Sequence, residues 1–386
     1  MSLASDEKTE QCLLIIAGEE SGDLIGASLI RELIKLNPEL NIVGIGGDRM
    51  RNEGMNIIHH INEMAFLGFA EVVKHIPFIK KVQADVTNSV VNKNIKNAVL
   101  IDYPGFNLSI AKKLKKIETR IIYYVSPQLW AWGSGRMNKI KNLVDKMLVV
   151  FPFEEQLYND NGVDVSFVGH PLIERINNYQ FLSREELFNK FQLDLSKDIL
   201  LLMPGSRKQE VHKILPVTFN AAKKLAEEYN LQTVISCSNN LDENLFYETC
   251  KDSDIKVVKG HTYDLMKHSR FGIIKSGTST LEAGYFEIPM IVVYKTSAVS
   301  YMIGRSLVKV DKIGMVNILL DDNVVPELIQ NDVTQENIYE TGKKILGDEN
   351  NYSLIKEKLS GINNKLGTAG ASARAANYIN ALMDET

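Results

Sequence analysis

The stretch CLLIIAGEESGDLIGASLIRELIKL, residues 12–36, decides the fold class. Its first six residues, 12–17, form a continuous apolar run of strand length. A turn follows over residues 18–23, and from about Leu24 to Leu36 apolar residues recur at helical spacing. A strand, a turn and a helix in this order are the unit from which parallel α/β sheets are built.

Apolar runs of strand length recur along the chain and predict two parallel sheets. They alternate with helical patterns, and the alternation pauses over residues 172–195 before it restarts. The predicted strands are Cys12–Ala17, Ile42–Ile45, Ala98–Ile101, Arg120–Val125, Lys146–Phe151, Val165–Val168, Ile199–Met203, Gln232–Cys237, Lys256–Val258, Phe271–Lys275 and Met290–Tyr294. We therefore predict an α/β fold of two doubly wound, Rossmann-like domains with an interdomain cleft, in which the carboxyl ends of the strands bind ligands. The predicted domains are residues 1–180 and 181–350, and residues 351–386 form a C-terminal helical segment that packs back on the first domain.

Composition and charge argue against several classes of protein. A chain of 386 residues is too long for one comfortable core, and a net charge of -4 argues against a general nucleic-acid binder. The cysteines Cys12, Cys237 and Cys250 have no ligand spacing, and no acidic or histidine cluster suggests a metal site. The first residues do not resemble a signal peptide, and no apolar run approaches the roughly 20 residues of a membrane span. We therefore expect a cytoplasmic protein that needs no metal and no cofactor.

Two loops of the first predicted domain carry acids directly after a strand. In the loop 18–23, small residues let a ligand approach the backbone, so that Glu19 and Ser21 would contact the hydroxyls of a sugar or an acceptor. The alternative for this loop is a tight turn with helix caps. Asp102 follows the run 98–101 and precedes Pro-Gly, which suits a general base that takes a proton from an attacking hydroxyl. The alternative for Asp102 is a cap on the next helix.

Both tryptophans of the chain, Trp130 and Trp132, follow the next predicted strand. They lie between a Ser-Pro pair that begins at Ser126 and a Gly-Ser-Gly turn that ends at Arg136. This context is typical of a cleft wall that stacks on a sugar or an acyl chain, and core packing is the alternative. His170 stands at the end of a later strand and is predicted to line the interdomain cleft.

Two loops of the second domain are predicted to bind phosphate. In the loop 203–211, Gly205 and Ser206 offer donors and Arg207 supplies a planar donor fork; a surface salt bridge is the alternative. The loop 275–284 again places small hydroxyl residues at the start of a helix. Glu282 lies on the first turn of that helix, where it could accept both hydroxyls of a ribose, and a plain helix cap is the alternative.

An apolar stripe edged with lysines runs over residues 64–82. Such a stripe suits a helix that lies in a membrane interface, and a helix that faces the protein core is the alternative. The residues predicted to meet the membrane are Phe66, Leu67, Phe69, Val73, Ile76, Lys80 and Lys81.

Together these loops resemble one family, lipid A disaccharide synthase, over nearly the whole chain. The most specific match is the run from Tyr124 to Trp132, Tyr-Val-Ser-Pro-x-x-Trp-Ala-Trp. The other matching segments are 17–23, 46–50, 101–107, 151–154, 167–170, 204–211, 276–282 and 317–320. The chain departs from the family at Gly133, where an Arg usually follows the second tryptophan, and at Met315-Val316, where Leu-Pro is common. These departures affect local contacts of the diphosphate and the acceptor.

The resemblance implies a GT-B glycosyltransferase of two Rossmann-like domains, with the donor nucleotide on the C-terminal one. The family joins UDP-2,3-diacylglucosamine to 2,3-diacylglucosamine 1-phosphate and gives a β-1,6-linked disaccharide and UDP. It inverts the anomeric centre and needs no metal. Its members work at the cytoplasmic face of the inner membrane, and domain-swapped homodimers are known among them.

The resemblance also assigns roles to residues of this chain. Asp102 becomes the catalytic base, with Glu19 as a helper. The nucleotide-sugar positions are Gly205, Ser206, Arg207, Glu210, Ser276, Gly277, Thr278, Glu282 and Asn317, and the acceptor or cleft positions are Ser21, Asn107, Ser126, Trp130, Trp132, Arg136 and His170.

Two other functions remain open at this stage. One is another UDP-N-acetylhexosamine enzyme on the same scaffold, such as a muramyl-lipid transferase or a 2-epimerase, although the twin-tryptophan run disfavours both. The other is a non-catalytic sensor of nucleotide sugars, which would have no need of an acid in the place of Asp102.

Overall fold

The computed structural model describes residues 11–64, 75–129, 134–251, 255–296 and 312–385. It divides into two compact units. Unit 1 comprises Met1–Glu174 together with Leu366–Thr386, and unit 2 comprises Arg175–Lys365. The chain therefore passes from unit 1 to unit 2 inside helix α8 (Pro171–Asn177) and returns to unit 1 after residue 365.

Unit 1 is built on a parallel sheet in the order β3-β2-β1-β4-β5-β6-β7. Its strands are β1 (Cys12–Ala17), β2 (Asn41–Gly46), β3 (Asn56–His60), β4 (Asn97–Ile101), β5 (Arg120–Tyr124), β6 (Lys146–Val149) and β7 (Val165–Phe167). Its helices are α1 (Glu20–Leu36), α2 (Asp48–Asn52), α4 (Ile76–Asn92), α5 (Pro104–Leu114), α6 (Met137–Leu143), α7 (Pro152–Asp160) and α18 (Ala371–Asp384), with short 3-10 turns η1 (Ile61–Glu63), η2 (Lys115–Ile117) and η3 (Ser134–Arg136). The central strands are buried throughout, which explains their unbroken apolar runs.

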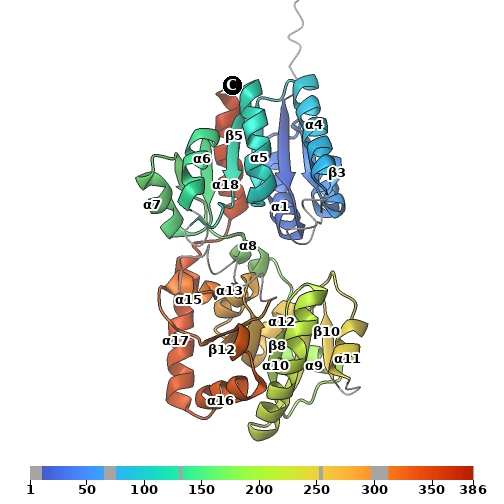
Figure 1. Ribbon diagram of the computed structural model, residues 1–386, viewed down its shortest axis with the longest axis vertical. Coiled ribbons are helices and arrows are strands. Elements are labelled where there is room, and N and C mark those ends of the chain that lie inside the picture. The colour runs from blue at the N-terminus through green and yellow to red at the C-terminus, as the bar shows by residue number, and fades with distance from the viewer. Residues whose placement is uncertain (1–10, 65–74, 130–133, 252–254, 297–311, 386) are drawn as a thin grey trace, which may run out of the picture. The chain divides into compact units, whose positions relative to one another are not determined.

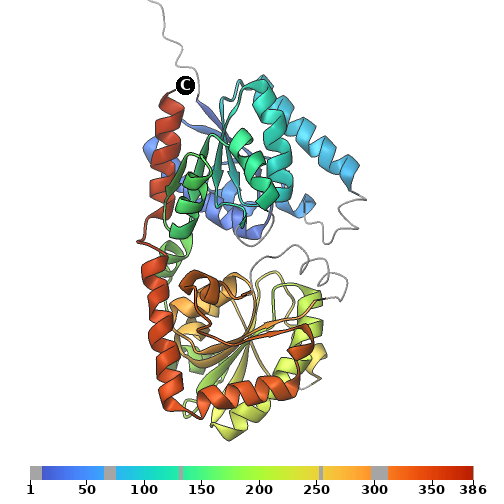
Figure 2. The ribbon, with the colours of Figure 1, turned by 60° about the vertical axis from the view of Figure 1, so that its left-hand side comes forward.

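Unit 2 repeats this plan with the strand order β10-β9-β8-β11-β12-β13. Its strands are β8 (Asp198–Met203), β9 (Leu231–Cys237), β10 (Lys256–Lys259), β11 (Ser269–Lys275), β12 (Met290–Tyr294) and β13 (Glu327–Ile329). Its helices are α9 (Arg184–Phe191), α10 (Lys208–Glu228), α11 (Asn244–Cys250), α12 (Thr262–Lys267), α13 (Thr278–Tyr285), α15 (Met315–Leu320), α16 (Gln335–Leu346) and α17 (Glu349–Lys365), with a 3-10 turn η4 (Gln330–Asp332). Helix α17 contacts both α13 and α16 (Figure 2).

The two sheets reverse their strand order at corresponding places. In unit 1 the first strand, β1, lies between β2 and β4, and in unit 2 the corresponding strand, β8, lies between β9 and β11. The crevice beyond the carboxyl ends of the strands at such a reversal is where doubly wound folds bind ligands. The loops that follow β1 and β4, and those that follow β8 and β11, are therefore the places to look for chemistry.

The C-terminal helix α18 belongs to unit 1, where it packs against α1 (Figure 1). Ala375, Ala376 and Ile379 are fully buried on its inner face. The guanidinium of Arg374 donates to the carbonyls of Val168, Thr368 and Ala369 at 2.7–2.8 Å. Residues 351–365 form most of α17 in unit 2, so the predicted C-terminal segment 351–386 is shared between the two units.

Candidate active site

Asp102 directly follows β4 at the strand reversal of unit 1. Its backbone φ is 45° and that of Tyr103 is 47°, so two consecutive residues other than glycine adopt the left-handed conformation. Main-chain contacts hold this turn. The amide of Asp102 donates to the Tyr124 carbonyl at 3.0 Å, and the carbonyl of Asp102 accepts from the Asn107 side chain at 2.7 Å and from the Tyr123 hydroxyl. Strain of this kind gathers at functional sites, where the surrounding structure enforces it.

The carboxyl group of Asp102 has the pKa that a base needs near neutral pH. Burial first, and the negative charge of Glu19 after it, raise this pKa to about 7, while the hydrogen bond from the amide of Tyr103 acts in the opposite direction. A general base is most effective when its pKa lies near the working pH. Carboxylates that are perturbed by burial and by a charged neighbour are frequent in active sites.

Glu19 comes from the other loop of this reversal. It is exposed and accepts a hydrogen bond from the equally exposed Ser21 at 3.0 Å. A Cβ atom on Gly18 would overlap the ring of Tyr103, so only glycine lets this ring lie against the turn after β1. The structure thus brings the loops 18–21 and 102–103 together at the carboxyl ends of the adjacent parallel strands β1 and β4.

Several predicted acceptor positions are occupied by contacts within the protein. Asn107 is fully buried and donates to the carbonyls of Ile101 and Asp102. Ser126 is buried and donates to the Glu154 carboxylate at 2.6 Å. These side chains support the loops after β4 and β5 from inside.

The remaining acceptor positions are spread over unit 1. Nδ1 of His170 accepts the Leu172 amide at 3.1 Å, and its ring lies 5.1 Å from that of Phe151. Arg136 is exposed at the end of η3. Trp130 and Trp132 lie outside the described residues.

The structure describes both ends of the predicted membrane stripe. Met64 and Val82, which bound the stripe, are buried in the hydrophobic core of unit 1. Ile76, Lys80 and Lys81 are exposed on the first turns of α4. Phe66, Leu67, Phe69 and Val73 lie outside the described residues. Among the described residues of the stripe, the exposed ones predicted to meet the membrane therefore lie on α4.

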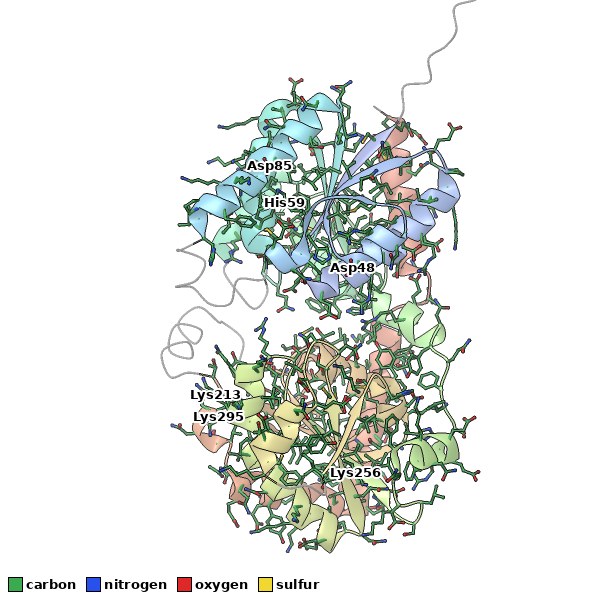
Figure 3. The ribbon with its side chains drawn as sticks, turned by 90° about the vertical axis from the view of Figure 1, so that its right-hand side faces the viewer. Asp48, His59, Asp85, Lys213, Lys256 and Lys295 are labelled. Carbon is green, nitrogen blue, oxygen red and sulfur yellow. The ribbon has the colours of Figure 1, made fainter. Side chains whose placement is uncertain are left out.

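Two charged residues of unit 1 have roles that sequence reasoning missed. Asp23, in the first turn of α1, is 3% exposed and accepts hydrogen bonds from the backbone amides of Gly47, Arg49 and Met50, so it caps α2. The side chain of His59 is only 12% exposed and lies 2.9 Å from the carboxylates of Glu63 and Asp85, the second of which is labelled with it in Figure 3. Burial opposes the charging of His59, and the hydrogen bonds to the two carboxylates outweigh it and raise its pKa.

In unit 2 the loop after β8 forms the first predicted phosphate turn. Gly205 has a φ of 125°, and a Cβ atom there would overlap the carboxylate of Glu210. That carboxylate accepts the Ser206 amide at 3.0 Å through Oε2 and lies 3.0 Å from the Lys275 ammonium through Oε1. The side chain of Arg207 is 60% exposed at the start of α10. The turn therefore presents a cation and a helix N-terminus, both of which favour an anion.

The loop after β11 forms the second phosphate turn. Gly277 precedes α13, Thr278 is exposed at its first position, and the hydroxyl of Ser276 donates to the Ile313 carbonyl at 2.7 Å. A hollow of about 540 Å³, lined by residues 239–244 and Lys259, adjoins the first turn, because the Asn240 side chain donates to the Ser206 carbonyl at 3.2 Å.

Glu282, on α13, is largely buried and held by two partners. Its Oε1 atom accepts from Arg175 at 2.9 Å and from the Tyr263 hydroxyl at 3.1 Å. Burial raises the pKa of Glu282, and the charge of Arg175 opposes that rise.

Asn317 is more deeply buried than the other residues predicted to bind the nucleotide sugar. It is fully buried and uses both ends of its amide within the fold, bonding Val325 and Glu327 at 2.8–3.0 Å. It joins α15 to the segment before β13.

Two general features bear on the chemistry. In the ranges that the structure describes, no group of three or more His, Cys, Asp or Glu side chains is placed to hold a metal ion. Over the same ranges, no helix has the length and apolar character needed to cross a membrane.

Residues 13–379 match the family described as lipid-A-disaccharide synthetase. The chain belongs to this family. It is 38% identical over 376 residues to the lipid-A-disaccharide synthase of Geobacter sulfurreducens, with 97% of each chain covered. It is 41% identical to that of Syntrophus aciditrophicus, which covers 94% of this chain and 96% of the relative. The family resemblance is thus confirmed: the chain is a glycosyltransferase of lipid A synthesis.

Solved structures of low sequence identity share the fold. A Staphylococcus aureus MnaA–UDP structure covers 97% of this chain and 98% of its own at a TM-score of 0.67 and 15% identity. The glycotransferase of kitacinnamycin covers 97% and 99% at a TM-score of 0.66 and 13% identity. At such identities the likeness concerns the fold alone, and it confirms the predicted pair of Rossmann-like domains. The 2-epimerase alternative gains nothing from it, because the sequence relatives are synthases.

Proposed function

We propose that this chain joins UDP-2,3-diacylglucosamine to 2,3-diacylglucosamine 1-phosphate and releases UDP. The observation that carries the proposal is Asp102, a strained and desolvated carboxyl group at the strand reversal of unit 1, in a member of the synthase family. Unit 1 would bind the acceptor sugar, and unit 2 the UDP-sugar. UDP is bound in the MnaA structure, which has the same fold, and this supports the proposal that the present chain binds a uridine nucleotide.

The proposed reaction is a direct displacement with inversion. The 6-hydroxyl oxygen of the acceptor forms a bond to the anomeric carbon of the donor, and its proton passes to the Asp102 carboxylate. The bond from that carbon to the diphosphate oxygen breaks, and its electron pair leaves with UDP. Asp102 has to be ionised to accept the proton, so turnover should rise with pH through about 7, the pKa raised by its burial.

The turns of unit 2 would stabilise the leaving diphosphate. Arg207 supplies positive charge, and the amides at the starts of α10 and α13 supply oriented dipoles. Neither contribution requires a metal ion, so we propose that the reaction needs no metal or cofactor and that EDTA leaves it intact. The expected position at the membrane surface and the domain-swapped homodimer both stay predictions.

The test compares two variants with the two acylated sugars as substrates. Asp102→Asn should lower turnover by at least about 100-fold, because a general base contributes roughly 10²–10⁴ to the rate. It should leave the affinity for UDP unchanged, since Asp102 lies in unit 1. Arg207→Ala should weaken UDP binding and also slow the reaction, because it would touch the diphosphate in both ground and transition states.

UDP release and UDP titration, both in the presence of EDTA, measure these effects. Near-normal turnover of Asp102→Asn would exclude it as the base and direct attention to Glu19. An absolute requirement for magnesium or manganese would contradict the metal-free account of the leaving group.

A further inference from the structure

Lys275, the last residue of β11, carries a cation into the middle of the two phosphate turns. Its ammonium lies 3.0 Å from Oε1 of Glu210, on α10. A Cβ atom on Gly277 would lie 3.8 Å from the same ammonium. The side chain is 21% exposed, against 60% for that of Arg207. Lys275 is therefore the more enclosed of the two cations at this reversal.

Glu210 fixes the ammonium in place. One oxygen of its carboxylate accepts the Ser206 amide at 3.0 Å, and the other meets Lys275 at the same distance. The ring of Tyr294, 5.9 Å from the ammonium, adds a further wall. Backbone amides and ammonium groups are the donors that phosphate oxygens accept. The Glu210 carboxylate thus contacts an amide from the first phosphate turn and an ammonium group from the second. Both are kinds of donor that bind diphosphate.

A second cation would help to stabilise the negative charge that develops in the proposed reaction. The diphosphate of UDP gains negative charge as its bond to the sugar breaks, and charges interact more strongly where solvent is excluded. The side chain of Arg207 is mostly exposed to water, where the electrostatic field of its charge is screened. An ammonium fixed beforehand between the turns stabilises the developing charge without having to be reorganised during the reaction.

We propose that Lys275 is a second diphosphate-binding cation, held between the two phosphate turns by Glu210, and that it stabilises UDP as it leaves. The inference rests on the proposed function, because it takes the diphosphate to bind at these turns. The competing explanation is a salt bridge that only joins β11 to α10.

The experiment titrates UDP, UMP and uridine against the full chain in EDTA. Lys275→Met removes the charge and keeps an unbranched side chain of similar length. It should weaken UDP binding by about 10-fold or more, as expected for a lost hydrogen bond between charged groups. Uridine should bind as it does to the wild type, and UMP should show a smaller loss than UDP. Lys275→Arg should keep UDP within a few-fold, because it restores the charge.

The matched control is Lys256→Met. Lys256 begins β10, so it lies at the amino ends of the strands, opposite the phosphate turns (Figure 3). This variant removes the same charge from unit 2 and should leave the binding of all three ligands unchanged. Thermal melting checks that each variant is folded. If Lys275→Met does not fold, Lys275→Gln, which keeps a hydrogen-bond donor for Glu210, replaces it with the same expected pattern.

The outcomes separate this inference from the proposed function. If the wild type prefers UDP to uridine and the neutral Lys275 variants keep that preference, Lys275 has no role at the diphosphate and the inference alone is overturned. An equal loss for uridine and UDP would identify a structural salt bridge and also overturn it. If the wild type itself binds UDP no more tightly than uridine, the proposed donor site fails and the inference fails with it.

Discussion

At the scale of single residues, Asp102 combines features that each cost stability. Its left-handed backbone is strained, its carboxyl group is desolvated, and the negative charge of Glu19 disfavours its ionisation. Contacts from Asn107 and Tyr123 to its carbonyl oxygen hold the turn without using the carboxylate. The residue is thereby kept in a high-energy state by its neighbours, which suits a base that has to react.

This arrangement predicts a pH-dependent gain in stability for Asp102→Asn. The folded pKa of Asp102 is raised to about 7 from a reference value of 3.8. Between these values the folded state keeps a proton that the unfolded state has lost, so stability falls as pH rises through this window and stays reduced above it. The neutral Asn escapes the penalty. The variant should therefore melt above the wild type at pH 8, and by a smaller margin at pH 5.

Thermal melts of both proteins at the two pH values measure this difference. Asp160→Asn, at an exposed position at the end of α7, controls for the general loss of one negative charge. If the margin between Asp102→Asn and the wild type is the same at pH 5 and pH 8, the carboxyl group does not titrate with the raised pKa.

Sequence reasoning located the loops better than it located the side chains within them. Asp102 was visible because an acid directly after a buried strand is poorly placed for packing. The inward-facing Ser126 and Asn317 could not be distinguished from ligand-binding residues, because small polar side chains can bond either to a ligand or to the protein itself. Their partners, Glu154 and the segment around Val325, come from elsewhere in the chain.

At the scale of elements, burial explains which strands were predicted. Every predicted strand corresponds to a strand of the structure, and apart from β7 and β10 these are central parallel strands, whose faces are both covered and whose residues are nearly all apolar. The two that were missed, β3 and β13, are the edge strands at one end of each sheet. β3 is half-buried and ends in two histidines, and β13 has only three residues. Such strands leave little periodic signal.

Helix α18 supplies the prediction at this scale. Arg374 near its start bonds three carbonyls, those of Val168, Thr368 and Ala369, and so ties the returning chain to the end of β7. A lysine has one ammonium and cannot reproduce this planar fork. Arg374→Lys should lower the free energy of unfolding by about 1–2 kcal/mol, since the partly buried carbonyl of Val168 then loses a charged donor.

Urea unfolding of the full chain measures this loss. Arg51→Lys, in an exposed ion pair with Asp48 on α2, is the control and should change stability by less than about 0.5 kcal/mol. An equal effect of the two substitutions would show that the Arg374 fork contributes no more than an ordinary surface arginine.

At the scale of the whole molecule, the chain builds one strand order twice and uses each copy for different chemistry. The reversal in unit 1 carries carboxylates, Glu19 and Asp102, and the reversal in unit 2 carries the cations Arg207 and Lys275. A base that accepts a proton and cations that stabilise a diphosphate are the two requirements of the proposed displacement. Because Glu210 offsets one of the cations, the ion group of unit 2 has a small net positive charge.

The charge of the whole chain also restricts how it could meet a membrane. A net charge of -4 gives no general attraction to anionic lipids, so any attraction has to be local. Ile76, which is 42% exposed, and Lys80 and Lys81 form an exposed apolar and basic patch on the first turns of α4. Lysines near an anionic surface contribute about 1 kcal/mol each, and added salt weakens them.

The last prediction is that this patch and the preceding residues 66–73 hold the protein on anionic vesicles. Phe66→Glu with Phe69→Glu should reduce binding to phosphatidylglycerol vesicles while the fold is retained, and Ile76→Glu should act in the same direction. Val91→Glu is the control, because Val91 is 59% exposed at the other end of α4 and lies outside the patch. Co-sedimentation at low and high salt measures the binding, and thermal melting reports the fold. Unchanged vesicle binding, or an unfolded double variant, would assign the apolar residues to the core. This segment would then not be the membrane contact.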